Sequence, residues 1–186
     1  NLSEMFYSVN TVFESAIQSK EIQYSIDTNI QHKYAVCDKT KLQEIYLNIV
    51  SNAIKYTPNG QAIHVNITET ASDDKKAWYV FICEDTGIGM KQEYLPHIFD
   101  EFSREHTATE NKVVGTGLGL SIVKSFVELM DGKIYVESEQ GKFHWRLHQK
   151  RMYTKRKSRN SLLYLIRVLE SEFFLRKIYR WQKMQE

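Results

Sequence analysis

Hydrophobic residues recur along this chain with two different periods, and these periods predict its helices and strands. A spacing of three to four residues, typical of an amphipathic helix, occurs over residues 3–19, 39–57, 118–130 and 161–182. In the first predicted helix, which Ser3 could cap, the apolar residues are Leu2, Met5, Phe6, Val9, Val12, Phe13, Ala16 and Ile17. Each of the first three helices is expected to bury one face.

Alternation of apolar and polar residues, typical of half-buried strands, predicts the sheet. The predicted strands cover residues 22–26, 34–37, 62–68, 78–83 and 133–138. Residues 78–83 are a nearly continuous apolar run, not an alternating one, and this strand is expected to place Asp85 at its end. Turn residues separate these elements: Pro58-Asn59-Gly60 ends the second helix, Ser72 to Lys75 forms a hairpin turn, and Asp131-Gly132 ends the third helix. Residues 90–102 are expected to contain short helical turns.

The order of these elements, α-β-β-α-β-β-loop-α-β, predicts an α/β fold. We expect a two-layer sandwich in which a mixed, mostly antiparallel sheet carries helices on one face, followed by a C-terminal helical tail. We therefore expect the chain to divide into a domain over residues 1–148 and a basic connector with an amphipathic helical tail over residues 149–186.

The charge balance supports this division. Residues 143–186 carry 12 Lys and Arg residues but 3 Asp and Glu residues. Residues 1–142, in contrast, carry 13 Lys and Arg residues and 20 Asp and Glu residues. The tail helix could dock on the domain or a partner, which is the favoured alternative. It could also lie on an anionic membrane, bind nucleic acid, or be a non-native extension such as a shifted reading frame. The sequence leaves these alternatives open, with nucleic acid not expected.

Several function classes receive no support from the sequence. Two cysteines, Cys37 and Cys83, cannot form a disulfide framework, so a reducing compartment is the simpler assumption. No apolar run approaches the roughly 20 residues that span a bilayer, and no secretory signal heads the chain. His97, His106 and His144 lack partners at metal-ligand spacing. A cytoplasmic protein is therefore expected.

Two glycine clusters organise the candidate chemistry. Residues 84–90 and 115–124 flank a polar segment, 103–114, and the second cluster runs into a predicted helix. Glycine has no Cβ to keep a ligand away, and the free N–H groups of a helix N-terminus favour phosphate. The spacing is neither the dinucleotide-binding Gly-x-Gly-x-x-Gly pattern nor a Walker loop, so nucleotide binding would need another architecture.

Several polar side chains have both a structural and a functional interpretation. Asn48 and Asn52 share one helix face and could bond neighbouring loops, which the helix alone favours, or coordinate Mg²⁺. Lys55, one turn further, could meet phosphate or be an ordinary surface lysine. Asp85 could orient the turn that follows it, or accept a hydrogen bond from an exocyclic amine such as that of adenine. Phe102, like Phe99, is expected to be a core aromatic at the base of the loop.

Together, four ordered segments resemble the catalytic ATP-binding domain of bacterial two-component sensor histidine kinases. Their superfamily includes the gyrase-type and mismatch-repair ATPases. Residues 47–58 look like its N box, 85–90 its G1 box, 98–102 its F box and 115–124 its G2 box. The resemblance covers about residues 1–142.

The resemblance implies ATP and Mg²⁺ as ligands and gives the polar residues roles. Asn52, helped by Asn48, should bind Mg²⁺, Lys55 should meet the phosphates, Tyr56 should pack near the nucleotide, and Asp85 should read the adenine amine. Residues 103–114 should form a mobile lid over ATP. The remaining implied nucleotide-binding residues are Gly87, Gly89, Phe102, Gly115, Thr116, Gly117, Leu118 and Gly119.

The implied reaction transfers the γ-phosphoryl group to a histidine of a separate phosphoacceptor domain, with a response regulator downstream. Asn48, Asn52 and Lys55 would carry it, mostly by positioning and charge neutralisation. Hydrolytic relatives place a glutamate general base four residues before the metal-binding asparagine. Here that residue is Asn48, an amide that cannot take a proton, and this favours a kinase over an ATPase. A truncated module that binds ATP or a partner without transfer is the other alternative.

The sequence departs from the family at both ends. No helical hairpin with a phosphoacceptor histidine precedes the motifs, so the chain is expected to phosphorylate nothing in cis and to be monomeric. It could be the cytoplasmic part of a membrane-anchored kinase, associated with the membrane only through other regions. After Lys142 the usual Gly- and Ser/Thr-rich turn is missing, and the alternation of Phe143, Trp145 and Leu147 predicts a final strand directly.

Overall fold

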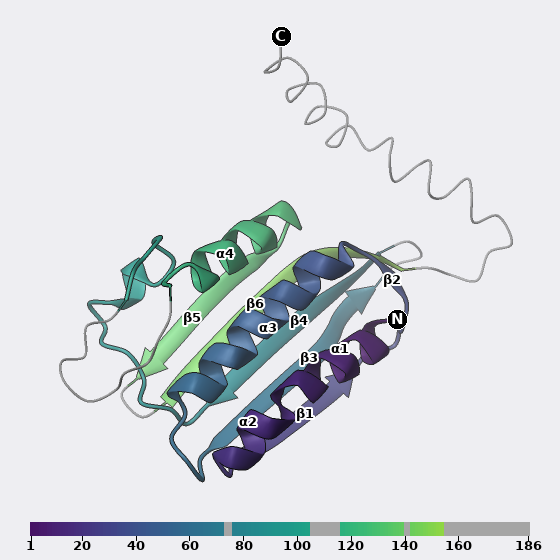
Figure 1. Cartoon of the computed structure of the whole chain (residues 1–186). Helices are drawn as coiled ribbons and strands as arrows, with labels where there is room; N and C mark the ends of the chain where they lie inside the picture. Colours follow the sequence, from purple (N-terminus) through teal and green to yellow (C-terminus); the bar gives the residue numbers. More distant parts are fainter. Residues whose placement is uncertain (73–75, 105–115, 140–141, 155–186) are drawn as a thin grey trace, which may run out of the picture. The chain divides into compact units, whose positions relative to one another are not determined.

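A computed structural model describes residues 1–72, 76–104, 116–139 and 142–154. Helices lie on one face of a mixed sheet (Figure 1). The helical elements are α1 Leu2–Asn10, η1 Thr11–Phe13, α2 Glu14–Ser19, α3 Lys39–Tyr56, η2 Leu95–His97 and α4 Gly119–Leu129. The strands are β1 Gln23–Asn29, β2 Ala35–Val36, β3 Ala62–Ser72, β4 Lys76–Asp85, β5 Lys133–Glu139 and β6 Lys142–Thr154.

The sheet is built around β3, β4 and β6. Its order is β1-β3-β4-β6, and both β2 and β5 pair with β6. The β1–β3 pair is parallel, and the other pairs are antiparallel. In Figure 1, α1, α3 and α4 all cover the same face. The predicted α/β two-layer architecture with a mixed, mostly antiparallel sheet is therefore confirmed.

The central helix α3 follows directly from its sequence. Asp38 caps its start, because one carboxylate oxygen accepts a hydrogen bond from the backbone N–H of Lys41 at 3.1 Å. Its apolar stripe is buried against the sheet and α4. The helix ends at Tyr56, because continuing it would require a hydrogen bond from the backbone N–H of residue 58 to the Ile54 carbonyl, and Pro58 has no N–H. The fully buried residues of this core include Tyr46, Ile49, Val50, Ile63, Val65, Val123 and Val127.

The first helix is interrupted, which the sequence pattern does not predict. One turn of 3₁₀ helix separates α1 from α2, and Asn1, not Ser3, caps the start. At the break, the side-chain oxygen of Asn10 accepts hydrogen bonds from the hydroxyls of Tyr24 and Tyr46, at 2.8 and 2.6 Å. The two tyrosines come from β1 and α3, so long-range bonding fixes this break.

Several elements extend beyond their predicted ends. β3, β4 and β6 continue past the ends of the predicted strands because backbone pairing does not require an apolar side chain at each position. β6 reaches Thr154 and so takes up the first residues of the segment predicted as a connector. The hairpin turn at 73–75, most of the loop at 103–114 and the predicted tail helix lie outside the described residues.

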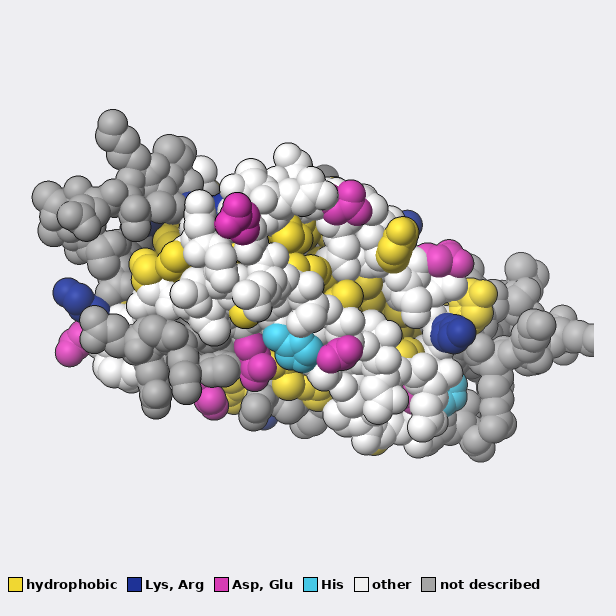
Figure 2. Space-filling view, turned by 90° about the horizontal axis from the view of Figure 1, so that it is seen from below, with side chains coloured by type: hydrophobic (Ala, Val, Ile, Leu, Met, Phe, Trp, Pro, Cys, Tyr) yellow, Lys and Arg dark blue, Asp and Glu magenta, His cyan; other side chains and the backbone are white. Residues whose placement is uncertain are grey.

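The described surface is mixed in character. In the view of Figure 2, hydrophobic side chains are interspersed with acidic, basic and polar ones. Within the described ranges, no helix is long and apolar enough to cross a membrane.

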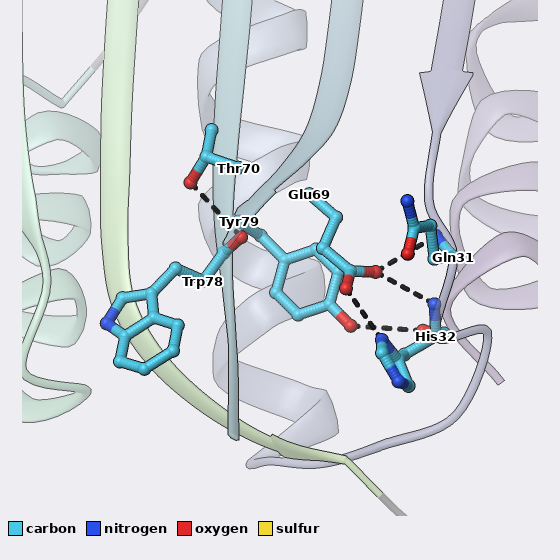
Figure 3. Close-up of polar contacts among 6 residues, drawn as sticks. All are labelled: Gln31, His32, Glu69, Thr70, Trp78 and Tyr79. Carbon is cyan, nitrogen blue, oxygen red and sulfur yellow. Dashed lines mark hydrogen bonds and ion pairs between the residues drawn. The ribbon is translucent and has the colours of Figure 1, made fainter. Parts of the chain in front are cut away.

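A buried carboxylate fixes the connection between β1 and β2 (Figure 3). Glu69 of β3 accepts hydrogen bonds from the backbone N–H groups of Gln31 and His32 at 2.9 and 2.8 Å, and the His32 ring lies 2.6 Å from its other oxygen. Tyr79 donates its hydroxyl to the His32 carbonyl. Burial acts to raise the pKa of Glu69, but the bonds from His32 and Gln31 outweigh it and lower the pKa. Because Leu2 N–H also bonds this connection, the cluster anchors the start of the chain.

Replacing Glu69 by glutamine is expected to lower the free energy of unfolding at pH 7 by about 2 kcal/mol, since charged acceptors make the stronger bonds. The folded-state pKa is depressed, so the carboxylate stabilises the fold above the unfolded value of about 4.3. That contribution is lost as pH falls through the lower folded-state pKa. In denaturant unfolding, the stability difference between the parent and the variant should therefore start to shrink below about pH 4.3 and vanish only below the folded-state pKa. Glu128→Gln, at an exposed position on α4, serves as control and should change neither the free energy of unfolding at pH 7 nor its pH dependence.

Candidate nucleotide-binding site

The second half of α3 carries the two candidate metal ligands. Asn48 and Asn52 are half-buried on the same helix face. The Asn48 amide nitrogen donates to the Glu44 carbonyl at 2.8 Å. A Cβ added to Gly119, the first residue of α4, would lie 2.6 Å from the Asn48 side-chain oxygen. Asn48 thus contacts the start of α4, so the N-box helix meets the second glycine cluster directly.

The first glycine cluster forms a turn against the end of α3. Asp85, at the last position of β4, is 5% exposed, and its Oδ1 accepts a hydrogen bond from Gly87 N–H at 2.8 Å. Ile88 N–H donates to the Tyr56 carbonyl at 3.3 Å. A Cβ at Gly87 would lie 2.5 Å from Asp85 Oδ1 and 2.8 Å from the Tyr56 oxygen, so only glycine fits there. Gly89 follows with a φ of 70°.

A backbone hydrogen bond joins the two ends of the predicted lid. Phe102 N–H donates to the Gly117 carbonyl at 3.1 Å. Gly117 has a φ of 74°, and a Cβ there would lie 2.8 Å from the Phe102 carbonyl carbon. Phe102 itself has a φ of 60° and is 69% exposed, so the prediction of a core aromatic is wrong for this residue. Its left-handed backbone turns the side chain outward, while Phe99 packs beside the core as predicted.

The charges of two cations, Lys55 and Arg104, act on one another. The pKa of Lys55 lies below its ordinary value, first because partial burial disfavours the ammonium and second because the Arg104 charge is nearby. The Lys55 ammonium also lies 5.3 Å from the centre of the Tyr56 ring. A bound anion would relieve the repulsion between the two cations. Sequence analysis missed Arg104, although its position as the first basic residue after the F box was a usable signal.

The start of α4 has the form of an anion site. Leu118 occupies the N-cap position without a side-chain cap, and its N–H donates to the Thr116 hydroxyl at a long 3.4 Å. The N–H groups of the first helical turn therefore point out of the helix without a capping side chain. Gly115 lies outside the described residues.

The donor set is compatible with Mg²⁺ held jointly with phosphate. The side-chain oxygens of Asn48 and Asn52 are hard ligands of the type that Mg²⁺ takes. Across the described ranges, no three His, Cys, Asp or Glu side chains gather into a metal site. The ion would consequently need oxygens from a phosphate and from water, as is usual for Mg²⁺ bound with a nucleotide.

Comparison with known protein families gives one match over most of the described chain. The model of the histidine kinase-, DNA gyrase B- and HSP90-like ATPase family matches residues 37–151. That range contains all four segments that carry the candidate site.

Curated relatives are longer proteins. The autoinducer 2 sensor kinase/phosphatase LuxQ of Vibrio parahaemolyticus is 29% identical over 143 residues, covering 76% of this chain and 17% of that protein. Hybrid signal transduction histidine kinase D of Dictyostelium discoideum is 32% identical over 138 residues, 74% of this chain and 9% of that protein. The sensor histidine kinase WalK of Bacillus subtilis is 36% identical over 109 residues, which cover 59% of this chain and 17% of that protein. This chain spans less than a fifth of each relative.

Solved structures share the fold. The catalytic domain of histidine kinase ThkA has a TM-score of 0.68 at 24% identity and covers 81% of this chain and 92% of its own. Full-length ShkA in complex with AMPPNP has a TM-score of 0.69 at 22% identity, and the match covers 87% of this chain and 32% of the ShkA chain.

Proposed function

Because the chain belongs to the family of histidine kinase-, DNA gyrase B- and HSP90-like ATPases, we propose that it binds ATP with Mg²⁺ and acts as the catalytic domain of a histidine kinase. The γ-phosphoryl group passes to a histidine of a separate phosphoacceptor domain. The bond from phosphorus to the ADP oxygen breaks, a bond from phosphorus to the imidazole nitrogen forms, and ADP leaves.

The observation that carries the proposal is the contact of one helix with both glycine clusters. α3 meets the second cluster through Asn48 and Gly119, and its last residues meet the first cluster through Tyr56 and Ile88. The candidate metal ligands and Lys55 thereby lie on one rigid element, which also holds the turn that follows Asp85. Such preorganisation is what phosphoryl transfer requires from a protein.

Each residue then has a distinct role. Asp85 accepts a hydrogen bond from the adenine amine, and Tyr56 packs near the nucleotide. Lys55 and Arg104 bind phosphate oxygens, together with the N–H groups at the start of α4. Asn48 and Asn52 hold Mg²⁺, which when bound neutralises phosphate charge.

Transfer is favoured over hydrolysis by the residue at position 48. Asn48 uses its amide to bond the Glu44 carbonyl and cannot act as a general base. The Glu44 residue itself is exposed. Steady phosphate release by the purified chain would support an ATPase instead. ATP binding without transfer to a phosphoacceptor domain supplied in trans would support a module that only binds.

The partners follow from this proposal. They are a histidine phosphoacceptor domain and, downstream, a response regulator; ThkA has been solved in complex with the response regulator protein TrrA. A cytoplasmic location is part of the proposal, since ATP and these partners are cytoplasmic.

Replacing Asn52 by alanine is expected to remove the effect of Mg²⁺ on nucleotide affinity. In calorimetric titrations with a non-hydrolysable ATP analogue, Mg²⁺ should tighten binding to the parent at least tenfold, about 1.4 kcal/mol, and should leave the variant unchanged. Binding without Mg²⁺ should be similar in both proteins. Asn29→Ala, at an exposed position ending β1, is the matched control and should behave as the parent. An unchanged Mg²⁺ effect in Asn52→Ala would rule this residue out as a ligand.

A further inference from the structure

Lys20 reaches from the end of α2 to the end of α3. Its ammonium donates hydrogen bonds to the backbone carbonyls of Ile54, Lys55 and Thr57, at 2.7, 3.1 and 3.0 Å. Its own carbonyl accepts a hydrogen bond from Gly60 N–H at 2.9 Å. Both the side chain and the backbone of Lys20 are therefore bound to the segment that leads from α3 into β3.

The sequence explains why α3 needs a donor from elsewhere. The last four carbonyls of a helix have no partner within it, and the residue four positions after Ile54 is Pro58, which has no N–H to offer. Here the Ala53 carbonyl is satisfied by Thr57 N–H, and the Tyr56 carbonyl by Ile88 N–H. Lys20 satisfies the two carbonyls between them. A positive charge at this end of the helix is also favoured by the helix dipole.

The carbonyls that Lys20 binds belong to the candidate nucleotide site. Lys55 is the proposed phosphate-binding lysine, and Lys20 holds its backbone. The next residue, Tyr56, holds the glycine turn through Ile88. The segment is thus fixed from one side by α2 and from the other by the turn that begins at Asp85. Loss of the first support would remove the Lys20 donor from the part-buried carbonyls of Ile54 and Lys55 and allow the segment to shift.

We propose that Lys20 is a positioning residue for nucleotide binding: through the backbone of residues 54–57 it sets the place of Lys55 and of the turn at 85–88. This inference rests on the proposed function, because the affinity it controls is that for ATP. A role restricted to capping the helix would lower thermal stability but leave the affinity of the folded protein unchanged.

The test uses the full chain with Lys20→Met, which keeps much of the aliphatic stem and removes the donors. At a temperature well below unfolding, its affinity for a non-hydrolysable ATP analogue is expected to fall about tenfold. Lys20→Arg, which restores N–H donors, should recover most of the loss. Lys39→Met makes the same substitution at the exposed opposite end of α3 and should bind as the parent does. Lys20→Gln, with two donors on a shorter side chain, should be intermediate and provides the measurement if Lys20→Met does not fold.

Amide hydrogen exchange without nucleotide separates this inference from the proposed function. In the Lys20 variants the Ile88 and Thr57 amides should exchange faster than in the parent, whereas amides of β3 should not change. Failure of the parent to bind nucleotide would contradict the proposed function and leave this exchange test to decide whether Lys20 fixes the turn. Unchanged Ile88 exchange, or parent-like affinity in a folded but less stable Lys20→Met variant, would overturn the role of Lys20.

Discussion

Replacing Asp85 by asparagine is expected to weaken binding of a non-hydrolysable ATP analogue about 100-fold while preserving the fold. Asparagine keeps an oxygen that can accept the Gly87 N–H bond, so the turn should survive. Its second polar group is a donor, which would face the adenine amine, itself a donor, in place of an acceptor. A lost charge-assisted bond contributes about 1.5–3 kcal/mol, and unfavourable donor–donor contact adds to this. Calorimetry of the parent and the variant measures the difference.

Two further variants distinguish base recognition from general damage. Asp85→Ala also removes the acceptor for Gly87 N–H and is expected to lower both affinity and thermal stability, because a buried donor is left without a partner. Asp27→Asn changes an exposed carboxylate on β1 and should affect neither property. Parent-like affinity in a folded Asp85→Asn protein would show that this carboxylate only orients the turn.

Replacing Gly117 by alanine is expected to break the hydrogen bond that joins the two ends of the predicted lid. The positive φ alone costs an L-residue roughly 1–2 kcal/mol. The added Cβ would also lie 2.8–2.9 Å from backbone atoms of Phe102, which cannot move aside as a flexible side chain can. The bond from Phe102 N–H should therefore be lost, and nucleotide affinity should fall at least tenfold along with stability, since forced contacts of this kind cost about 1–3 kcal/mol more.

Gly60 provides a matched control for this substitution. It has almost the same φ, 75° against 74°, but open space where the Cβ would lie. Gly60→Ala should show the backbone cost in thermal or denaturant unfolding, with no change in nucleotide affinity. If the two variants lose the same stability and both bind nucleotide normally, the contact between Gly117 and Phe102 has no part in binding.

The sequence predicted the parts of this molecule that depend on local periodicity and turn chemistry. The 3.6-residue pattern located α3, whose predicted end lies one residue past Tyr56. The continuous apolar run at 78–83 placed Asp85 at the end of β4, where the structure has it. The family resemblance was also readable, because its four motifs are contiguous stretches of sequence, and it is confirmed by the family match over residues 37–151.

Features that depend on distant partners were not predictable in the same way. The break at Asn10 arises from hydroxyls on β1 and α3, and the outward turn of Phe102 from its pairing with Gly117, fifteen residues along the chain. The parallel pairing of β1 with β3 likewise has no signature in either strand. Periodicity reports only which face of an element is buried, not which element covers it.

Lys20 and Arg104 show this limit within the site. In the sequence, nothing distinguishes Lys20 and Arg104 from the other Lys and Arg residues, of which the chain has 25 in all. Lysines and arginines are common on protein surfaces. The chain alone therefore determined the elements, the motifs and the family, because local backbone preference and short contiguous patterns encode them. Tertiary structure alone decided which cation caps α3 and which cation's charge acts on Lys55, because a long flexible side chain acquires a role only when folding brings a partner within reach.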